Sequence, residues 1–310
     1  MVIKRKKRWL WAVAVVVMLL LALMWFLNQP KNEIPTASRG TLEIFPHFES
    51  SFVPDRDVVV WLPEGYQPGD STDVLYMHDG NMLFDATTTW NHQEWRIDEV
   101  MDSLIQAGKI RPCIVVGIYN TKKRLTEYFP VKTCQYVAEA DRKKAKMKKL
   151  TADNYLKFII EELKPFIDEK YKPLTTREHT FMMGSSMGGL ISLYALCEYP
   201  QVFGGVGCLS SHLSMAHLPA GVKGDVWATG FRNYVNAQLP AAGSGLIYMD
   251  HGTKDLDKDY GPYQTLLDNV IMAKGWDEVH YMSRVYQGHG HNETSWARRL
   301  DQPLLFLMGK

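Results

Sequence analysis

The stretch FMMGSSMGGL, residues 181–190, decides the fold of this 310-residue chain. Its five residues GSSMG fit the pattern G-x-S-x-G, with Ser186 at the centre. Residues 179–183 read as a short buried strand, and residues 190–199 carry the apolar spacing of a helix. In so sharp a turn, a Cβ two residues from the serine collides with neighbouring backbone, so glycine is needed on both sides. The stretch therefore predicts a strand, a tight turn that presents Ser186, and a helix.

Strands and helices alternate along the rest of the chain. The other predicted strands are TLEIFPHFES, RDVVVWLPEGY, DVLYMHDG, CIVVGIYN, FGGVGCLSS, GLIYMDHG and HYMSRVYQG. Further helices are predicted at residues 96–107, 152–169 and 262–274, with a kink at Pro165. This alternation predicts an α/β fold: a mostly parallel, doubly wound sheet with helices on both faces, entered by an antiparallel strand pair.

The charge is concentrated at one end of the chain. The composition, 46% hydrophobic and 22% charged, is that of a globular protein, and the net charge is +1. The segment KRKKR at residues 4–8 holds five of the 35 basic residues, which leaves 30 basic against 34 acidic residues elsewhere. Because the remainder is slightly acidic, we expect no nucleic-acid partner.

An apolar run follows the basic cluster. Trp9 to Leu27 gives 19 consecutive apolar residues, enough to cross a bilayer as a helix. We predict a cytoplasmic basic segment at 1–8, an uncleaved transmembrane signal anchor at 9–27, a polar linker at 28–40, and an exported domain at 41–310 on the periplasmic or extracellular side. The alternative is a signal peptide that is cleaved, so that the domain is secreted.

The four cysteines, at positions 113, 134, 197 and 208, have no disulfide-framework spacing. We expect buried free thiols. No CxxC or Cys/His pattern suggests zinc, so neither a metal nor another cofactor is expected.

A serine hydroxyl becomes a nucleophile when a histidine takes its proton, and a carboxylate orients that histidine. In this type of fold the chain order is serine, acid, histidine. The loop GHGHNETSW offers His289 and His291 after the last predicted strand. We select His291, because it lies next to the start of the following helix.

The acid is sought in YMDHGTKDLDKDY, which follows the preceding strand and contains four aspartates. Asp250 lies at the strand end, and Asp259 is placed to begin the next helix, where an acidic residue favours the helix dipole. Asp255 and Asp257 therefore remain as alternatives.

Two amide donors are needed for the oxyanion that develops during acyl transfer. One is the N–H of Met187, the residue after the serine. The second is expected in MHDGNMLF, where Gly80 permits a tight turn and the N–H of Asn81 or Met82 points at the site.

Taken together, several segments resemble an esterase family of α/β hydrolases that includes esterase D, feruloyl and acetyl-xylan esterases, and enterochelin esterase-like proteins. The matching segments are VWLPEGY, VLYMHDGNMLFD, IRPCIVVGIYN, GSSMGGLISLYAL, YPQVFGGVGCLS, DHGTKDLDKDYGPYQ and GHGHNETSW, spread over roughly residues 41–308. The resemblance implies an α/β-hydrolase domain at 41–310 with a Ser-His-Asp triad and no cofactor.

Carried onto this chain, the resemblance assigns the serine to Ser186 and the base to His291. The family pattern G-T-x-D selects Asp255, and the version G-T-x-x-L-D selects Asp257; we assign Asp257, with Asp255 as the alternative. HDG replaces the HGxGG of many relatives, and we assign the second oxyanion amide to Asn81.

The expected activity is hydrolysis of carboxylic esters through an acyl-enzyme. Acylated carbohydrates or siderophore-type esters suit an exported, anchored enzyme. An acyltransferase with the same triad, or a non-catalytic binding protein on this scaffold, is the alternative. Trp90, Trp95 and His212 are candidates to line a pocket, although both tryptophans also suit packing beside the sheet. The sequence indicates no oligomeric state.

Overall fold

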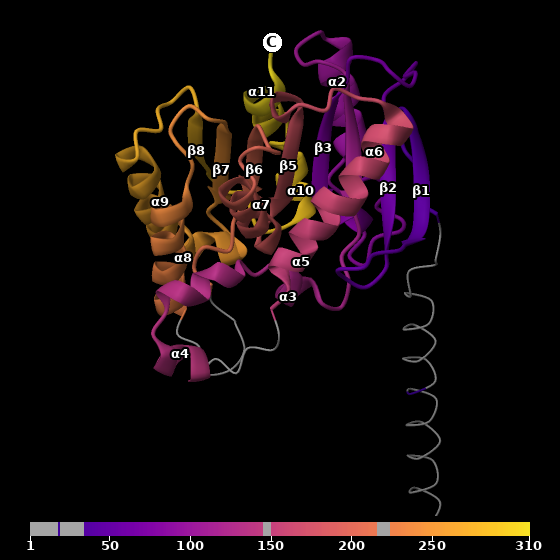
Figure 1. The fold of residues 1–310 in the computed structure, drawn as a ribbon. Helices are drawn as coiled ribbons and strands as arrows, with labels where there is room; N and C mark the ends of the chain where they lie inside the picture. The colour runs from indigo at the N-terminus through magenta and orange to yellow at the C-terminus, as the bar shows by residue number, and fades with distance from the viewer. Residues whose placement is uncertain (1–17, 19–33, 145–149, 216–223) are drawn as a thin grey trace, which may run out of the picture.

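An eight-stranded β-sheet runs through the protein and carries helices on both faces (Figure 1). The computed structural model describes residue 18 and residues 34–144, 150–215 and 224–310. The strands are β1 (Thr41–Phe48), β2 (Arg56–Leu62), β3 (Asp73–His78), β4 (Cys113–Ile118), β5 (Thr180–Ser185), β6 (Gly205–Leu209), β7 (Leu246–Gly252) and β8 (Tyr281–Tyr286). Each of the predicted strands is present.

The strand order is β1-β2-β4-β3-β5-β6-β7-β8. Strand β2 pairs antiparallel with both β1 and β4, whereas all the other neighbouring pairs are parallel. The predicted antiparallel entry into a parallel sheet is therefore confirmed. Because the strands from β3 to β8 are parallel, the loops that follow them meet along one edge of the sheet.

Helices and short helical turns connect the strands. The helices are α2 (Ile97–Gln106), α3 (Arg124–Glu127), α4 (Glu139–Lys144), α5 (Ala152–Lys157), α6 (Lys164–Tyr171), α7 (Met187–Glu198), α8 (Gly224–Gln238), α9 (Gly261–Ala273), α10 (Glu293–Ala297) and α11 (Asp301–Met308). The short turns are η1 (Gly80–Met82), η2 (Val131–Tyr136), η3 (Phe158–Leu163), η4 (Arg177–His179) and η5 (Asp255–Asp259).

Alternate side chains of the central strand β3 enter two different cores. Tyr76 belongs to the larger core, which contains residues of α5, α7, α8 and α9. Its neighbour Met77 belongs to the core on the other face, with residues of α2, α10 and α11. Since successive side chains of a strand point to opposite faces, a continuous apolar run is what a sheet covered on both sides requires.

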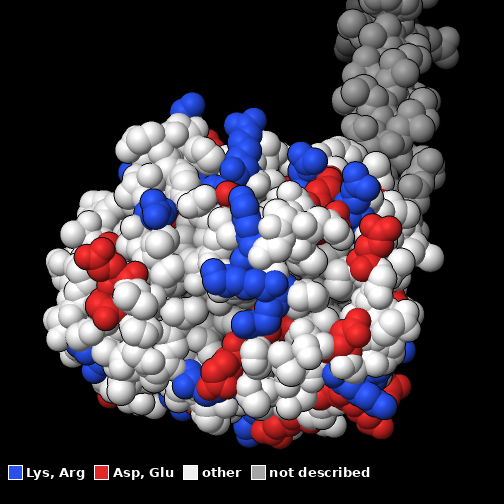
Figure 2. Space-filling model, turned by 90° about the horizontal axis from the view of Figure 1, so that it is seen from above, with Lys and Arg blue, Asp and Glu red and all other residues white. Residues whose placement is uncertain are grey.

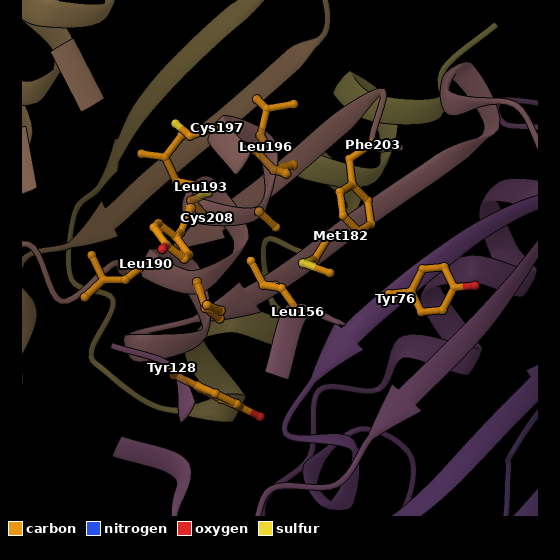
Figure 3. Packing of buried hydrophobic residues seen from close by; sticks show 14 of the residues in the cluster. Tyr76, Tyr128, Leu156, Met182, Leu190, Leu193, Leu196, Cys197, Phe203 and Cys208 are labelled. Atoms are coloured by element: carbon orange, nitrogen blue, oxygen red, sulfur yellow. The ribbon is translucent and has the colours of Figure 1, made fainter. Parts of the chain in front are cut away.

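Helix α7 lies at the centre of the larger core (Figure 3). Its side chains Leu190, Leu193 and Leu196 share one cluster with Met182 of β5. The helix is buried around nearly its whole circumference, since β5, β6 and α8 all contact it. The sequence predicts this helix from residue 190, but the structure starts it at Met187, directly after Ser186.

The predicted helix at 152–169 is present, with a change of winding in its middle. Helix α5 passes into η3, which is a π-helical segment, and then into α6. Pro165 has no N–H to donate to the carbonyl four residues earlier, which disfavours regular α-helical winding there. The π segment ends two residues before this proline, so the irregularity lies where the sequence predicts a kink.

The predicted anchor at 9–27 lies outside the described residues, apart from Met18. None of the helices in the described residues is long and apolar enough to cross a membrane. The described end of the predicted linker is fastened to the domain. The amide and hydroxyl of Thr36 donate to Asp85, and the amides of Ser38 and Arg39 donate to Asp98 of α2.

Side chains of both charges occupy the surface. On the face drawn in Figure 2, basic side chains run from the middle toward the upper edge and groups of acidic side chains lie on either side and below, so neither charge covers the face. The cysteines are free thiols: Cys113, Cys197 and Cys208 are buried and Cys134 is half-buried. This agrees with the predicted absence of a disulfide framework.

Candidate active site

The turn between β5 and α7 presents Ser186 in a strained conformation. Its φ is 58° and its ψ is −120°, a region that residues with a side chain rarely occupy. The flanking glycines make the turn possible, because a Cβ on Gly184 would lie 3.0 Å from the carbonyl carbon of Gly188 and 2.9 Å from Cδ2 of His78. The strand–turn–helix context predicted from GSSMG is therefore present.

Backbone hydrogen bonds hold this turn against the end of β6. The amide of Ser186 donates to the carbonyl of Leu209 at 3.0 Å, and its own carbonyl accepts from the amide of His212 at 3.2 Å. Ser186 is half-buried at the N-terminus of the twelve-residue helix α7. The positive end of the helix dipole therefore lies at this serine.

Two backbone amides near the turn are available to a ligand. Met187 is the first residue of α7, where amides have no partner within the helix. The amide of Asn81, in η1, likewise has no acceptor among the described residues. The amide of Met82, the other predicted donor, is already bonded to the carbonyl of Asp79 at 2.9 Å.

A partly buried ion pair holds the loop that carries Asn81. Asp79 has a left-handed backbone, with φ 57° and ψ 46°, and its carboxylate receives two hydrogen bonds from Arg124 of α3, at 2.6 and 2.8 Å. Asn120 adds a third at 2.7 Å. Burial acts to raise the pKa of Asp79, but Arg124 and Asn120 outweigh it and hold that pKa below its ordinary value. Gly80 fits closely, since a Cβ there would lie 2.5 Å from Gly117.

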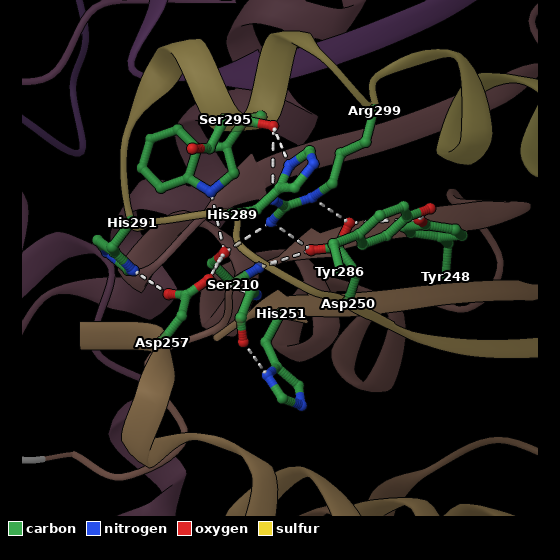
Figure 4. Close-up of polar contacts among 12 residues, drawn as sticks. Ser210, Tyr248, Asp250, His251, Asp257, Tyr286, His289, His291, Ser295 and Arg299 are labelled. Atoms are coloured by element: carbon green, nitrogen blue, oxygen red, sulfur yellow. Dashed lines mark hydrogen bonds and ion pairs between the residues drawn. The ribbon is translucent and has the colours of Figure 1, made fainter. Parts of the chain in front are cut away.

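The loop after β8 brings His291 to a buried aspartate. Nδ1 of His291 lies 2.6 Å from Oδ1 of Asp257 in η5 (Figure 4). Oδ2 of Asp257 accepts from the hydroxyl of Ser210 and from the amide of Gly252, each at 2.6 Å. Burial acts to raise the pKa of Asp257, but the bonds from His291, Ser210 and Gly252 together lower it. Asp257 is therefore held as an anion that accepts hydrogen bonds.

The other predicted candidates lie elsewhere. Asp255 is exposed, and among the described residues its carboxylate accepts only from the backbone amide of His291, at 3.3 Å. Nδ1 of His289 lies 3.1 Å from the carbonyl of Ser295. Asp250 is buried against Arg299. The structure thus brings together His291 and Asp257, and no carboxylate other than Asp257 contacts the imidazole of His291 among the described residues.

His212 and Tyr260 connect Ser186 to His291 by a chain of contacts. The amide of His212 binds the carbonyl of Ser186, and its Nδ1 lies 2.7 Å from the hydroxyl of Tyr260. The ring of Tyr260 meets that of His291 edge to face, with centroids 5.7 Å apart. Within the described residues, no hydrogen bond joins the Ser186 hydroxyl to His291. Catalytic hydrogen bonds of this kind are often long before a substrate binds.

Sequence reasoning did not identify His78, which packs beneath the serine turn. It is buried, its Nδ1 lies 2.9 Å from the hydroxyl of Tyr155, and burial lowers its pKa to about 3. A neutral histidine therefore packs against Gly184 and Gly188. The residue appears in the quoted HDG segment, but nothing local indicates which element its ring contacts.

The predicted pocket residues have three different environments. Trp95 is buried and lies against Trp296, with ring centroids 5.3 Å apart, so it is a packing residue. Trp90 is 74% exposed, and His212 is buried beside Ser186. A cavity of about 800 Å³ lies beside α2 and α10, but Ser186 and His291 do not line it. The described residues contain no cluster of three His, Cys, Asp or Glu side chains arranged to hold a metal ion.

Comparison with known protein families gives a match over most of the chain. The profile of the family described as "Putative esterase" matches residues 50–307. A solved structure of a ferulic acid esterase has a TM-score of 0.64 at 21% identity, and covers 87% of this chain and 98% of that one. The enterobactin esterase FES from Shigella flexneri has a TM-score of 0.60 at 19% identity, covering 90% of this chain and 62% of that one.

Curated proteins give two informative similarities. The chain is 22% identical over 273 residues to the uncharacterized protein YbbA of Bacillus subtilis (strain 168), covering 83% of this chain and 94% of the relative. It is 32% identical over 156 residues to an endo-1,4-beta-xylanase/feruloyl esterase of Xylanibacter ruminicola, covering 49% of this chain and 19% of that protein.

Proposed function

Because this chain belongs to the esterase family whose profile spans residues 50–307 and is therefore a carboxylic ester hydrolase, we propose that Ser186, His291 and Asp257 form its catalytic triad. The observation that carries this proposal is the 2.6 Å contact between Nδ1 of His291 and Asp257. It fixes the histidine tautomer with the proton on Nδ1. Nε2 then carries the lone pair that a general base needs.

The reaction proceeds through an acyl-enzyme. Nε2 of His291 takes the hydroxyl proton of Ser186 as Oγ attacks the ester carbonyl carbon. The tetrahedral intermediate collapses, the C–O bond to the alcohol breaks, and the imidazolium gives its proton to the departing alcohol. Water then attacks the acyl-enzyme with His291 again as base, which releases the acid and restores Ser186. Asp257 stabilises the imidazolium throughout.

The oxyanion is stabilised by the amides of Met187 and Asn81. Both lack acceptors among the described residues. The first also lies at the positive end of α7. Asp79, which precedes the oxyanion loop, is neutralised by Arg124, so its negative charge does not oppose the developing oxyanion.

The substrate class is proposed from the relatives. A feruloyl esterase and an enterobactin esterase are among the similar proteins, and these names describe esters of an aromatic acid and a siderophore. We propose an acylated carbohydrate or a siderophore-type ester as the substrate of this chain.

An anchored, exported location is proposed from the sequence alone. The run of 19 apolar residues at 9–27 follows the basic segment KRKKR, an arrangement that holds the N-terminus in the cytoplasm. Alkaline carbonate extraction of membranes is the measurement: an anchored chain stays in the pellet, and release into the supernatant contradicts the proposal.

The neighbouring serine supplies a matched control for the nucleophile. In the full-length protein, Ser186→Ala is expected to lower kcat for p-nitrophenyl acetate by about three to six powers of ten. Ser185 lies one residue earlier, at the buried end of β5. Ser185→Ala is expected to keep activity within about tenfold of wild type, because the Ser185 hydroxyl has no role in the proposed reaction.

Retained turnover in Ser186→Ala would exclude the proposed nucleophile. Feruloylated sugars, acetylated sugars and a catecholate siderophore ester, assayed in parallel, then separate the substrate classes. Adding a sugar alcohol as acceptor tests for acyl transfer, because a transferase gives a new ester where a hydrolase gives only the acid.

A further inference from the structure

A second serine, Ser210, lies on the side of Asp257 that faces away from His291 (Figure 4). It follows strand β6, is fully buried, and has a positive φ of 41°. Its hydroxyl oxygen lies 2.6 Å from Oδ2 of Asp257, 2.9 Å from Nε1 of Trp296 and 2.9 Å from Nη2 of Arg299. One hydroxyl thus joins the acid of the proposed triad to two residues near the C-terminus.

The direction of these hydrogen bonds is forced by chemistry. An indole N–H and a guanidinium N–H can only donate, so Trp296 and Arg299 occupy the two lone pairs of the Ser210 oxygen. The single hydroxyl proton is then left for Asp257, whose carboxylate can only accept. Ser210 therefore donates to Asp257, and the two donors behind it polarise its O–H bond.

The cation behind Ser210 is itself held rigidly. Nε and Nη2 of Arg299 donate to the two oxygens of Asp250 at 3.0 and 2.9 Å, and both side chains are almost fully buried. Tyr248 adds a hydrogen bond to Asp250 at 3.2 Å. Such a bidentate pair fixes the plane of the guanidinium, so its position relative to Ser210 is set by β7 and the C-terminal helices.

Trp296 contacts both the hydroxyl of Ser210 and the imidazole of His291. Its ring meets that of His291 edge to face, with centroids 5.2 Å apart, while its N–H donates to Ser210. Among the described residues, the ionisable groups around the His291–Asp257 pair include Tyr260 at the imidazole ring, His212 bonded to Tyr260, Asp259 near Tyr260, and Asp255 at the backbone of His291.

We propose that Ser210 is a positioning residue of this esterase, which holds the acid of the triad through a hydrogen bond that Arg299, Asp250 and Trp296 orient. The proposal rests on the proposed function, since it assigns Ser210 a role only if Asp257 is the acid. It explains why a hydroxyl is kept at a buried position with unfavourable φ, where glycine is less strained.

Removal of the Ser210 hydroxyl changes the negative charge on the carboxylate that contacts the His291 imidazole. Without a donor on Oδ2, more negative charge remains on Asp257, and the carboxylate stabilises the imidazolium more strongly. Protonation of the base then occurs at higher pH. The acid limb of the kcat/KM profile is expected to move upward by about half a pH unit to one unit, which by itself lowers kcat/KM at neutral pH by less than about tenfold. Above this limb, the less firmly held Asp257 orients His291 less well, and kcat/KM there is expected to fall by up to about tenfold.

Two substitutions at the same position separate this role from a purely structural one. Ser210→Ala and Ser210→Gly both remove the hydroxyl, but only glycine relieves the strain of φ 41°. If Ser210 positions Asp257, both variants share the same shift of the acid limb, although they differ in thermal stability. Ser283→Ala, which removes an exposed hydroxyl on β8, is the matched control and keeps the wild-type profile.

The profiles are measured with p-nitrophenyl acetate on the full-length protein, beside Ser186→Ala. Wild-type midpoints in both Ser210 variants, or losses that follow stability without any shift, overturn the positioning role. If Ser186→Ala is inactive in that case, the proposed nucleophile and the ester hydrolase activity stand, and only the role of Ser210 is excluded. If Ser186→Ala retains activity, the proposed function fails instead.

Discussion

Two aspartates in η5, separated by one residue, have different surroundings. Asp255 has a left-handed backbone with φ 55°, and its exposed side chain accepts a hydrogen bond from the amide of His291. Asp257 is fully buried, and its carboxylate receives hydrogen bonds from His291, Ser210 and Gly252. The local turn points one carboxylate at backbone and the other at the imidazole.

At this scale we predict unequal effects of the same substitution. Asp257→Asn is expected to lower kcat/KM by about three to four powers of ten, because an amide at this place no longer stabilises the imidazolium and permits the wrong histidine tautomer. Asp255→Asn is expected to cost less than about tenfold, since an amide oxygen still accepts from the amide of His291. Ester hydrolysis by the two variants measures this, and a larger loss in Asp255→Asn would reverse the assignment.

At the scale of elements, η1 depends on α3. The loop that carries Asn81, the proposed oxyanion donor, follows Asp79, and the carboxylate of this left-handed residue is held by the guanidinium of Arg124. The ring of Tyr128 lies beneath that guanidinium, with the cation 5.1 Å from the ring centroid. A helix that follows β4 thereby fixes a loop that follows β3, across two neighbouring parallel strands.

We predict that Arg124→Gln lowers both activity and stability. Asp79 would remain largely buried without its cation, which is expected to destabilise the fold by about 2 kcal/mol. The loosened amide of Asn81 is expected to lower kcat about tenfold to a hundredfold. Adding Asp79→Asn removes the unpaired charge and is expected to recover stability but not kcat. Chemical denaturation and steady-state kinetics measure the two effects; a single variant with wild-type kcat would show that the pair only stabilises the fold.

At the scale of the whole molecule, Asp98 fastens residues 38 and 39, at the described end of the predicted linker, to helix α2. This buried carboxylate in the first turn of α2 accepts the amides of Ser38 and Arg39, at 2.6 and 3.2 Å. Burial, followed by a hydrogen bond that the protonated Asp98 donates to Glu99 and by the negative charge of Glu99, raises the pKa of Asp98 to about 7. Glu99 also acts on Glu94: burial, together with the charges of Glu99 and Asp85, raises the pKa of Glu94 as well.

The raised pKa of Asp98 makes the folded chain less stable as pH rises, because an ionised Asp98 is buried and lies beside Glu99. Between the ordinary carboxyl pKa of about 4 and about 7, the folded chain keeps a proton on Asp98 that the unfolded chain has lost. The free energy of unfolding therefore falls as pH increases through this range. Asp98→Asn cannot ionise and still accepts both amides, so its Tm is expected to exceed that of wild type by a few degrees at pH 8 and to match it near pH 4. Thermal unfolding at both pH values measures this, and parallel curves would contradict it.

The secondary structure, and the choice of Ser186 and His291 as candidates, could be predicted from the sequence. Hydrophobic periodicity is a local property, so the strands and the helices at 97–106 and 261–273 could be predicted from their own residues. GSSMG and the order of serine, aspartate and histidine likewise need only the chain. Helix α8 is not among the predicted elements: its Gly230 disfavours a helix locally, yet a Cβ there would lie 2.5 Å from Val137, so close packing requires the glycine.

Tertiary structure decided the contacts between segments that are distant in sequence. Ser210 and Arg299 are 89 positions apart, and Asp79 and Arg124 are 45 apart, with no local pattern to pair them. The direction of the Asp257 side chain depends on how η5 packs against β6 and the loop that carries His291. Local propensity determines which helix or strand a residue forms. The geometry of a site depends on residues distant in sequence that the folded sheet brings to its edge, and a local sequence pattern does not identify them.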